Sequence, residues 1–240
     1  AAVILYGRNA VREALRGRRA HAVEEIWASG GAARESWLQG LNVKPASAQE
    51  LERRCGSSAH QGICAQAGGY PYVSAQELLS GPDPLIVALD QVQDPQNLGS
   101  ICRSAECAGA TGVVIPERRA VEVTPAVCKA SAGAVEHLRI ARVRNIADFL
   151  GEAGRTGCWS YGASLAETAA RYDTLDYSGG VVLVLGSEGS GLRPRVAAQC
   201  DQLVSLPMRG RISSLGVSAA AAALLYGILQ HRPTGLDKAP

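Results

Sequence analysis

Aromatic residues are scarce in this chain of 240 residues, which has one Phe, three Trp and seven Tyr. Because 47% of the residues are hydrophobic, we expect a core of aliphatic side chains and alanine. Net charge is also small, at +2, so a polyanion would have to be held by local arginine clusters rather than by the whole molecule. The clusters are Arg16, Arg18 and Arg19; Arg118 and Arg119; Arg142 and Arg144; and Arg209 and Arg211.

Cysteine and histidine patterns typical of disulfide frameworks or metal sites are absent. The seven cysteines are scattered between Cys55 and Cys200 without a C-x-x-C pair, and the four histidines are dispersed. We therefore expect no metal and a reducing, cytoplasmic compartment. No apolar run approaches the roughly 18 residues of a membrane span, and the start AAVILYGRNA lacks the basic-then-apolar order of a signal peptide.

The segment GGYPYVSAQELLSGPDP is rich in Gly, Pro and Ser, which is typical of a linker with one short helical turn. We therefore predict a small α/β domain over residues 1–68, a linker over 69–84 and a second domain over 85–240. In the first domain, ILYGRNAVREALRG predicts a strand followed by a helix, and EEIWAS and HQGICAQA predict further strands.

Strands and helices alternate in the second domain. The predicted strands are LIVALD, GVVIP, LRIARV, CWSYGAS, VVLVLG and DQLVSLP. Helices are predicted from Asn97, from Thr124 and Pro125, from Ile146, over RPRVAAQC, and from Val217 to His231. Continuous Val, Ile and Leu runs predict an α/β fold whose mostly parallel sheet is buried on both faces. Ligands of such folds bind beyond the carboxyl ends of the strands.

Three loops beyond predicted strands combine glycine, small hydroxyls and a few polar side chains. The first, DPQNLGSICRSAECAG, repeats Asn97, Ser100 and Arg103 at every third position, on one face of a helix. Asn97 and Arg103 are therefore candidates to converge on one ligand. The alternative is that Asn97 only caps the helix and Arg103 is an exposed helix residue.

The second loop, LGSEGSGL, places Glu188 between two glycines at the end of a strand, where a backbone can approach a ligand closely. Its glycine spacing is G-x-x-G-x-G, and no acidic residue ends a following strand, so a Rossmann enzyme is disfavoured. A glycine-rich turn with a solvated Glu188 remains the alternative.

The third loop, LPMRGRISSLGVS, brings Ser213, Ser214 and Ser218 near two arginines, which suits a phosphate or a ribose. Ser214 could also be only the cap of the following helix. That helix contains the run AAAAALLYG, which is apolar on every face, so we expect the helix to be buried.

Taken in order, DPQNLGSICRSAECAG, LVLGSEGSGL and SLPMRGRISSLGVS resemble the three signature motifs of the SpoU (TrmH-type) RNA ribose 2'-O-methyltransferases, from about Leu85 to Arg232. YGRNAVREAL and HQGICA are similar to the small RNA-binding module, akin to ribosomal protein L30e, that precedes the catalytic domain in bacterial 23S rRNA guanosine methyltransferases of this family.

The resemblance implies a SPOUT-type fold with a C-terminal trefoil knot that holds S-adenosylmethionine, and a homodimer whose second copy completes the site. The cofactor contacts that it implies are Gly186, Leu206, Met208 and Leu215. The catalytic residues that it implies are Asn97, Arg103, Glu188 and Ser214. We expect RNA contacts from the clusters Arg16, Arg18 and Arg19; Arg118 and Arg119; and Arg209 and Arg211.

The predicted activity is methyl transfer to the ribose 2'-hydroxyl of a nucleotide, first of all guanosine in 23S rRNA. Related alternatives are a tRNA substrate, or an rRNA adenosine whose methylation confers antibiotic resistance. The chain departs from the family at Gly216, where the third motif normally has asparagine. This departure leaves open a different class, a non-catalytic RNA-binding or ribosome-assembly factor.

Overall fold

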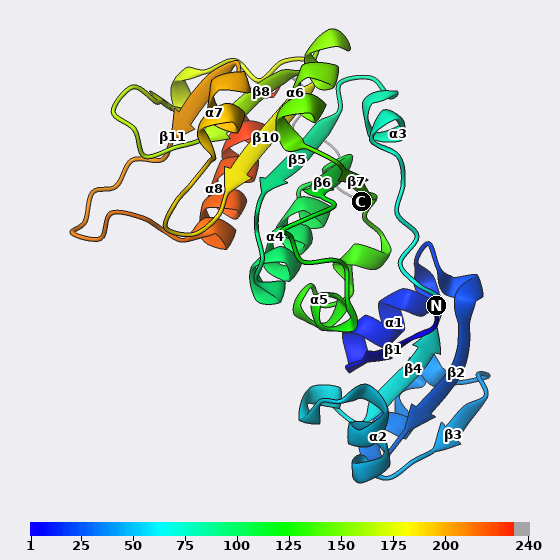
Figure 1. The fold of residues 1–240 in the computed structure, drawn as a ribbon. Helices are drawn as coiled ribbons and strands as arrows, with labels where there is room; N and C mark the ends of the chain where they lie inside the picture. The colour runs from blue at the N-terminus through cyan, green and yellow to red at the C-terminus, as the bar shows by residue number, and fades with distance from the viewer. Residues whose placement is uncertain (233–240) are drawn as a thin grey trace. The chain divides into compact units, whose positions relative to one another are not determined.

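A computed structural model describes residues 1–232, and the predicted second domain extends beyond them to residue 240. The chain forms two compact units (Figure 1). The first unit comprises residues 1–71 and 122–137, and the second comprises residues 72–121 and those from 138 onward. No helix within residues 1–232 is long and apolar enough to cross a membrane.

The first unit is built on a four-stranded sheet in the order β1-β4-β2-β3. Its strands are β1 (Val3–Tyr6), β2 (Val23–Ala28), β3 (Val43–Pro45) and β4 (Ile63–Ala67). Its helices are α1 (Arg8–Arg16), α2 (Ala48–Cys55) and α5 (Pro125–Ala130). The predicted strands of this unit and the helix after β1 are thus confirmed, whereas β3 and α2 were not predicted.

Helix α2 has a sequence signal at each end, a capping box at its start and a glycine at its end. The Ser47 hydroxyl accepts the Glu50 backbone N–H at 3.2 Å, and the Glu50 carboxylate accepts the Ser47 backbone N–H at 2.6 Å. This reciprocal pair satisfies donors that a helix start leaves free. Gly56 ends the helix with φ 69°, in the left-handed region. The motif S-x-x-E followed by Gly could therefore have predicted α2.

The segment Glu122–His137 lies in the first unit although it follows a strand of the second. Its helix α5 begins as predicted, with the Thr124 hydroxyl accepting the Val127 backbone N–H at 3.4 Å. The Glu136 carboxylate, 1% exposed, accepts hydrogen bonds from Arg19 at 2.6 and 2.8 Å. The compact units therefore differ from the predicted domain bounds in this segment, because a buried ion pair ties it to the N-terminal chain.

The second unit contains a seven-stranded sheet in the order β7-β6-β5-β10-β8-β11-β9, and all its neighbours pair in parallel. The strands are β5 (Leu85–Asp90), β6 (Gly112–Pro116), β7 (Ile140–Val143), β8 (Trp159–Ala163), β9 (Ala170–Arg171), β10 (Val181–Gly186) and β11 (Gln202–Ser205). The predicted parallel sheet is confirmed, and only the short β9 was not predicted.

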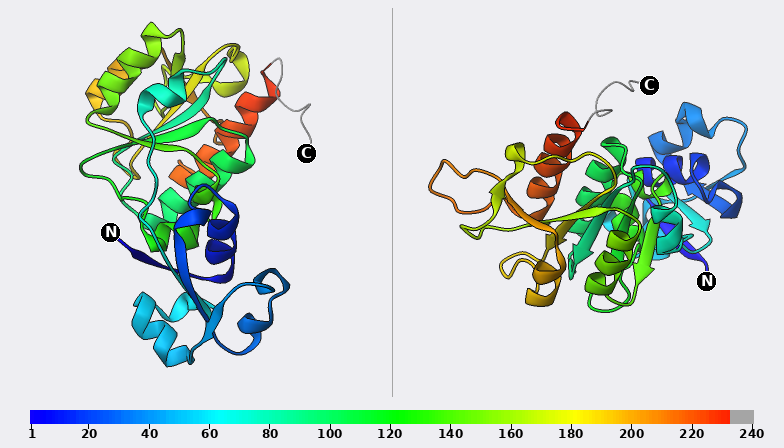
Figure 2. Two further views of the ribbon diagram at one scale, coloured as in Figure 1. Left: turned by 90° about the vertical axis from the view of Figure 1, so that its right-hand side faces the viewer. Right: turned by 90° about the horizontal axis from the view of Figure 1, so that it is seen from above.

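Helices cover both faces of this sheet. They are α3 (Ala75–Leu79), α4 (Pro95–Cys107), α6 (Ile146–Arg155), α7 (Pro194–Gln199) and α8 (Val217–Gln230). Helices α6 and α7 pack together on one face, and α4 and α8 pack together on the other (Figure 2). Strands β5 and β10, between these layers, are buried along their whole length, as their Val, Ile and Leu runs predict.

Residues 72–84, part of the predicted linker, belong to the second unit. Val73 forms a parallel bridge to Ala141, and α3 buries Leu78 and Leu79 in the core. Because these side chains are apolar, burial in the core outweighs the flexibility that the surrounding Gly, Pro and Ser residues favour.

Helices α4 and α8 are not capped by the residues considered in the sequence analysis. Asp94 caps α4 by accepting the Asn97 backbone N–H at 3.0 Å, so the helix begins at Pro95 rather than at Asn97. Gly216 occupies the cap position of α8, and among the described residues no side chain caps that helix. The simple capping alternatives for Asn97 and Ser214 are therefore wrong.

Candidate functional site

A cavity of about 670 Å³ lies in the second unit at the carboxyl ends of β8, β10 and β11. Its lining comes mainly from three stretches, residues 163–165, residues 185–192 and residues 206–217. The last stretch is the long loop between β11 and α8, drawn in orange in Figure 1. The position agrees with the rule that open α/β sheets bind ligands beyond their strand ends.

The loop after β10 folds back tightly on itself. The Gly191 backbone N–H donates to the Ser187 carbonyl at 3.0 Å, and the Ser187 and Ser190 hydroxyls lie 2.7 Å apart. A Cβ atom at Gly186 would overlap the backbone of Gly191, so only glycine allows this close approach. The turn exposes Glu188 at the mouth of the cavity.

The base of the same loop is tied to β5 by an ion pair that the sequence analysis missed. Arg193 follows the loop, and its side chain binds the carboxylate of Asp90 at 2.6 and 2.8 Å. Asp90 ends β5 and is 0% exposed. A lone charged residue ending an apolar strand was the only sequence signal for this contact.

The loop before α8 brings hydroxyl and apolar groups to the opposite wall. Ser213, Ser214 and Leu215 line the cavity and are exposed to it. Gly216 has φ 82° and ψ 155°, and a Cβ atom there would lie 3.4 Å from an oxygen of the Glu188 carboxylate. The carboxylate of Glu188 therefore sits beside the start of α8.

The structure gathers six of the predicted site residues around this cavity: Glu188, Ser214, Gly186, Leu206, Met208 and Leu215. Asn97 and Arg103 are on α4 and are absent from the cavity lining formed by the described chain. Asn97 is half-buried and Arg103 is exposed. The prediction that Asn97 and Arg103 share a face of α4 with access to a ligand stays a prediction.

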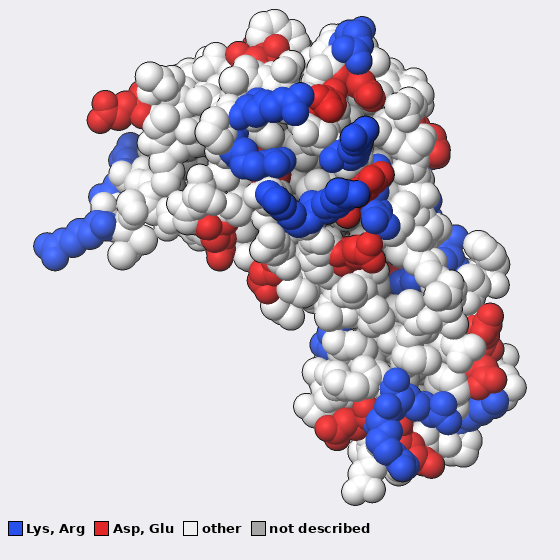
Figure 3. All heavy atoms as spheres, in the orientation of Figure 1, with Lys and Arg blue, Asp and Glu red and all other residues white. Residues whose placement is uncertain are grey.

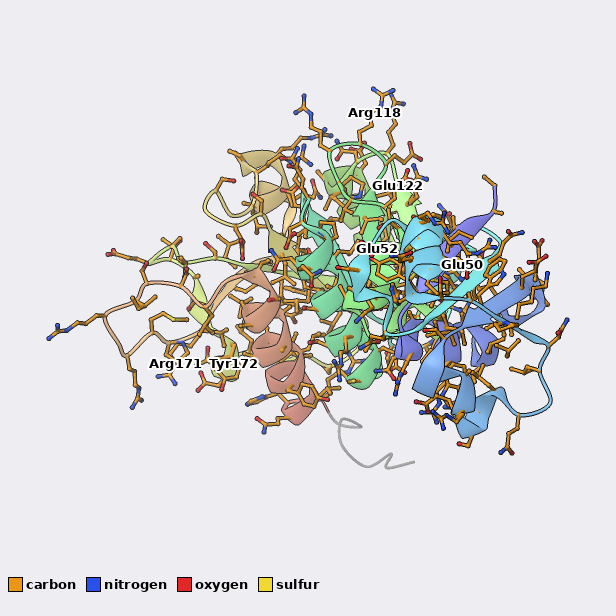
Figure 4. All side chains as sticks on the ribbon, turned by 90° about the horizontal axis from the view of Figure 1, so that it is seen from below. Glu50, Glu52, Arg118, Glu122, Arg171 and Tyr172 are labelled. Carbon is orange, nitrogen blue, oxygen red and sulfur yellow. The ribbon has the colours of Figure 1, made fainter. Side chains whose placement is uncertain are left out.

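The predicted RNA-contacting arginines differ in exposure. Arg118 and Arg119 are exposed on the loop after β6, and Figure 4 shows Arg118 pointing outward. Arg209 and Arg211 are exposed on the loop that lines the cavity. In the second unit, Arg side chains gather with interspersed acidic groups over the region of α6, β5 and β6 (Figure 3).

The N-terminal cluster requires a correction. Arg16 is exposed, and Arg18 donates a hydrogen bond to the Pro71 carbonyl at 3.1 Å. The Arg19 side chain is 2% exposed, forms an ion pair with Glu136 and donates a hydrogen bond to the Gly68 carbonyl. Arg19 is therefore a buried structural residue and not an RNA contact.

The segment that connects β8 with β10 packs against α8. Arg171 and Tyr172 lie beside α8 (Figure 4). A Cβ atom at Gly227 would lie 2.6 Å from the Tyr172 ring, so the helix needs glycine where the ring packs on it. This contact supports the helix whose first turn lines the cavity.

The thiol of Cys200 lies next to the parallel sheet. Burial raises the pKa of Cys200, which follows α7, to about 12, with the nearby carboxylates of Asp201 and Asp90 adding to the effect. The thiol is therefore neutral near pH 7 and a weak nucleophile. The described residues contain no group of three or more His, Cys, Asp or Glu side chains placed to hold a metal ion.

Two family models match the sequence. The SpoU rRNA methylase family model matches residues 84–226, and the model for RNA 2'-O ribose methyltransferase substrate binding matches residues 4–73. A relative in Bacillus subtilis, named as a TrmH family tRNA/rRNA methyltransferase, is 40% identical over 82% of this chain and 81% of its own length. A relative with the same family name in Staphylococcus haemolyticus is 32% identical over 96% of both chains.

Solved structures agree with these matches. An RNA methyltransferase of the TrmH family from Porphyromonas gingivalis has a TM-score of 0.76 at 27% identity, over 95% of this chain and 89% of that one. The SpoU methyltransferase AviRb from Streptomyces viridochromogenes, in complex with the cofactor AdoMet, has a TM-score of 0.79 at 25% identity over the same shares.

Proposed function

Because the chain belongs to the SpoU rRNA methylase family, we propose that it transfers a methyl group from S-adenosylmethionine to a ribose 2'-hydroxyl in RNA. Guanosine in 23S rRNA is the first candidate substrate. The observation that carries the proposal is the meeting of the second and third motif loops around one cavity. These loops are separated in the chain by α7 and β11, and they follow β10 and β11, two strands of the same parallel sheet that flank β8.

The cavity suits the proposed cofactor. Its volume lies within the range of about 300–1,000 Å³ that is usual for small-molecule sites. Leu206, Met208 and Leu215 offer apolar surface, and the backbone at Gly186 permits close approach. The Glu188 carboxylate can face a cationic group. When bound, S-adenosylmethionine supplies an electrophilic methyl group.

The polar residues then have distinct roles. A guanidinium keeps its proton in proteins, so we assign Arg103 to holding a phosphate and stabilising the developing alkoxide rather than to acting as a base. Glu188 orients a neighbouring polar group, and Ser214 contributes a hydroxyl beside the start of α8. Asn97 shares the face of α4 that carries Arg103.

A second copy of the chain completes the site in this proposal. Asn97 and Arg103 stand outside the cavity that the described single chain forms, which supports their delivery from a partner. Helix α8 exposes Ala219, Ala223 and Tyr226 on one face, although its sequence predicts burial on all sides. Such an apolar stripe suits a homodimer contact.

The proposal includes the trefoil knot and the RNA-binding role of the first unit. Strand β10 lies between β5 and β8, and the chain after β11 returns to the β10 loop, which suits a threaded C-terminal segment. The first unit, with its four-stranded sheet, would contact RNA in the manner of the L30e-like module, using Arg16 and Arg18. Arg209 and Arg211, on the loop that lines the cavity, and Arg118 and Arg119, on the loop after β6, would contact RNA phosphates.

The test is methylation of total bacterial RNA by the full chain with labelled S-adenosylmethionine, followed by nuclease mapping. We expect label at a single ribose of 23S rRNA. An RNA with a 2'-deoxy nucleotide at the mapped position is the matched control, and it should accept no label. Label in tRNA would identify tRNA as the substrate instead of 23S rRNA, and label on a base would refute 2'-O transfer.

Calorimetry with S-adenosylmethionine separates an enzyme from a scaffold. We expect saturable binding by the full chain. A protein that binds RNA but neither the donor nor its demethylated product would be the non-catalytic factor instead, and the proposed activity would be wrong.

A further inference from the structure

We infer that Asp90 and Arg193 form a positioning pair that holds the loop after β10 in its donor-binding shape. The inference rests on the proposed function, because it assigns this loop to the methyl donor. Neither residue lines the cavity formed by the described chain, so both would act through the loop rather than by touching the donor.

The pair closes the loop at its base. Asp90 is the register partner of Gly186 across the β5 and β10 pairing, so its carboxylate stands beside the first residue of the turn. Arg193 is the residue at the other end, directly before α7. Strand pairing therefore holds the start of the segment that carries Glu188 beside Asp90, and the Asp90 carboxylate holds its other end at Arg193.

Three contacts join Asp90 to Arg193. The Arg193 backbone N–H donates to one carboxylate oxygen at 2.9 Å, and the guanidinium Nε and Nη2 approach the other at 2.8 and 2.6 Å. Charge-assisted bonds of this kind are stronger and more directional than neutral ones. The backbone contact adds direct control of where the chain leaves the loop.

Burial makes the pair indispensable to this local geometry. Asp90 is 0% exposed, whereas the Arg193 side chain is 41% exposed. A buried carboxylate that loses its cation must find water or another donor, and residues 188–191 of the loop are exposed whereas the adjoining strands β5 and β10 are buried. The loop would therefore move first, and its movement would alter the cavity wall.

A neighbouring arginine provides a matched control. Arg195 lies two residues further along, on α7, and pairs with the exposed carboxylate of Asp148 at 2.7 Å. Its side chain is 69% exposed. Arg195→Ala removes the same charge from the same segment without touching the base of the loop.

The experiment compares Arg193→Ala, Arg193→Lys and Arg195→Ala in the full chain by calorimetry with S-adenosylmethionine. Because the alanine variant loses the charged hydrogen bonds of the guanidinium at the base of the loop, we expect Arg193→Ala to weaken donor binding about tenfold or more. Arg193→Lys keeps the charge and should recover part of this loss. Arg195→Ala should stay within about twofold of the unchanged protein, as surface pairs contribute little. RNA affinity should be unchanged in all three variants.

Amide hydrogen exchange of the protein without donor provides a readout that is independent of activity. In Arg193→Lys, exchange should rise at residues 187–192 while the central strands β5 and β10 stay protected. If Arg193→Ala does not fold, this comparison in the lysine variant still decides the question. Unchanged exchange in the loop, or equal effects of Arg193→Ala and Arg195→Ala on donor binding, would overturn the inference.

The coupling between the two residues is tested by Asp90→Asn. In that background Arg193→Lys should cause a smaller further loss of donor affinity than it causes alone. Additive losses would show that the residues do not act as a pair. Failure of the unchanged protein to bind the donor would count against the proposed function, whereas the exchange result judges the pair by itself.

Discussion

At the scale of single residues, Arg103 separates two chemical roles. In the proposed mechanism Arg103→Ala should lower methyl transfer about 100-fold or more, because it would remove the charge assigned to stabilising the developing alkoxide. Arg103→Lys should retain most of the activity, since a lysine supplies the charge without the guanidinium geometry. The measurement is kcat/KM for the two variants across pH. A lysine variant as inactive as the alanine variant would instead require a role that is specific to the guanidinium.

Gly216 stands where the asparagine of the third motif is expected. Its φ of 82° with ψ of 155° lies outside the left-handed region that asparagine tolerates, so any side chain there is strained. Gly216→Ala should lower the free energy of unfolding by about 1–3 kcal/mol in denaturant titrations. Gly210→Ala, on the same loop with open space at its Cβ, is the matched control and should change stability little. Equal stability of both variants would contradict the strain argument.

At the scale of secondary structure elements, loops at the carboxyl ends of β6 and β11 carry exposed arginines that we propose contact RNA. Arg118→Glu, on the loop after β6, should weaken RNA binding and lower the slope of log K against log salt by about one. Arg155→Glu makes the same charge change at the end of α6, directly before the turn into β8 and so away from those loops. It should leave the slope unchanged. Indistinguishable slopes for the two variants would remove the β6 loop from the RNA surface.

At the scale of the whole molecule, the ion pair of Arg19 and Glu136 joins chain segments 117 residues apart. Arg19→Ala would leave a buried carboxylate without its cation, so we expect the free energy of unfolding to fall by about 3–5 kcal/mol. Arg16→Ala is the control, because its side chain is 59% exposed and its pair with Glu13 is a surface contact. Its loss should change stability by less than about 1 kcal/mol. Denaturant titration distinguishes the two, and similar losses would refute the structural role of Arg19.

The chain passes three times between its two units, at residues 71–72, 121–122 and 137–138. The Gly- and Pro-rich stretch after residue 68 predicts only the first of these passages. The other two passages depend on which apolar surface the segment 122–137 packs against. The local sequence pattern does not specify that surface. The helix start at Thr124 was predictable because capping depends on neighbours along the chain.

The sequence by itself determined the strand and helix alternation, the parallel sheet and the three loops, because hydrophobic periodicity and glycine spacing act over a few residues. It also pointed to Glu188 and Ser214, whose loops line the cavity. Only the tertiary structure decided that Arg19 is buried against Glu136, that Asp90 binds Arg193 and that Asn97 and Arg103 stand outside the single-chain cavity. The physical reason is that burial and long-range pairing depend on which surfaces meet in three dimensions. The type of a charged residue does not determine whether its side chain is solvated or paired.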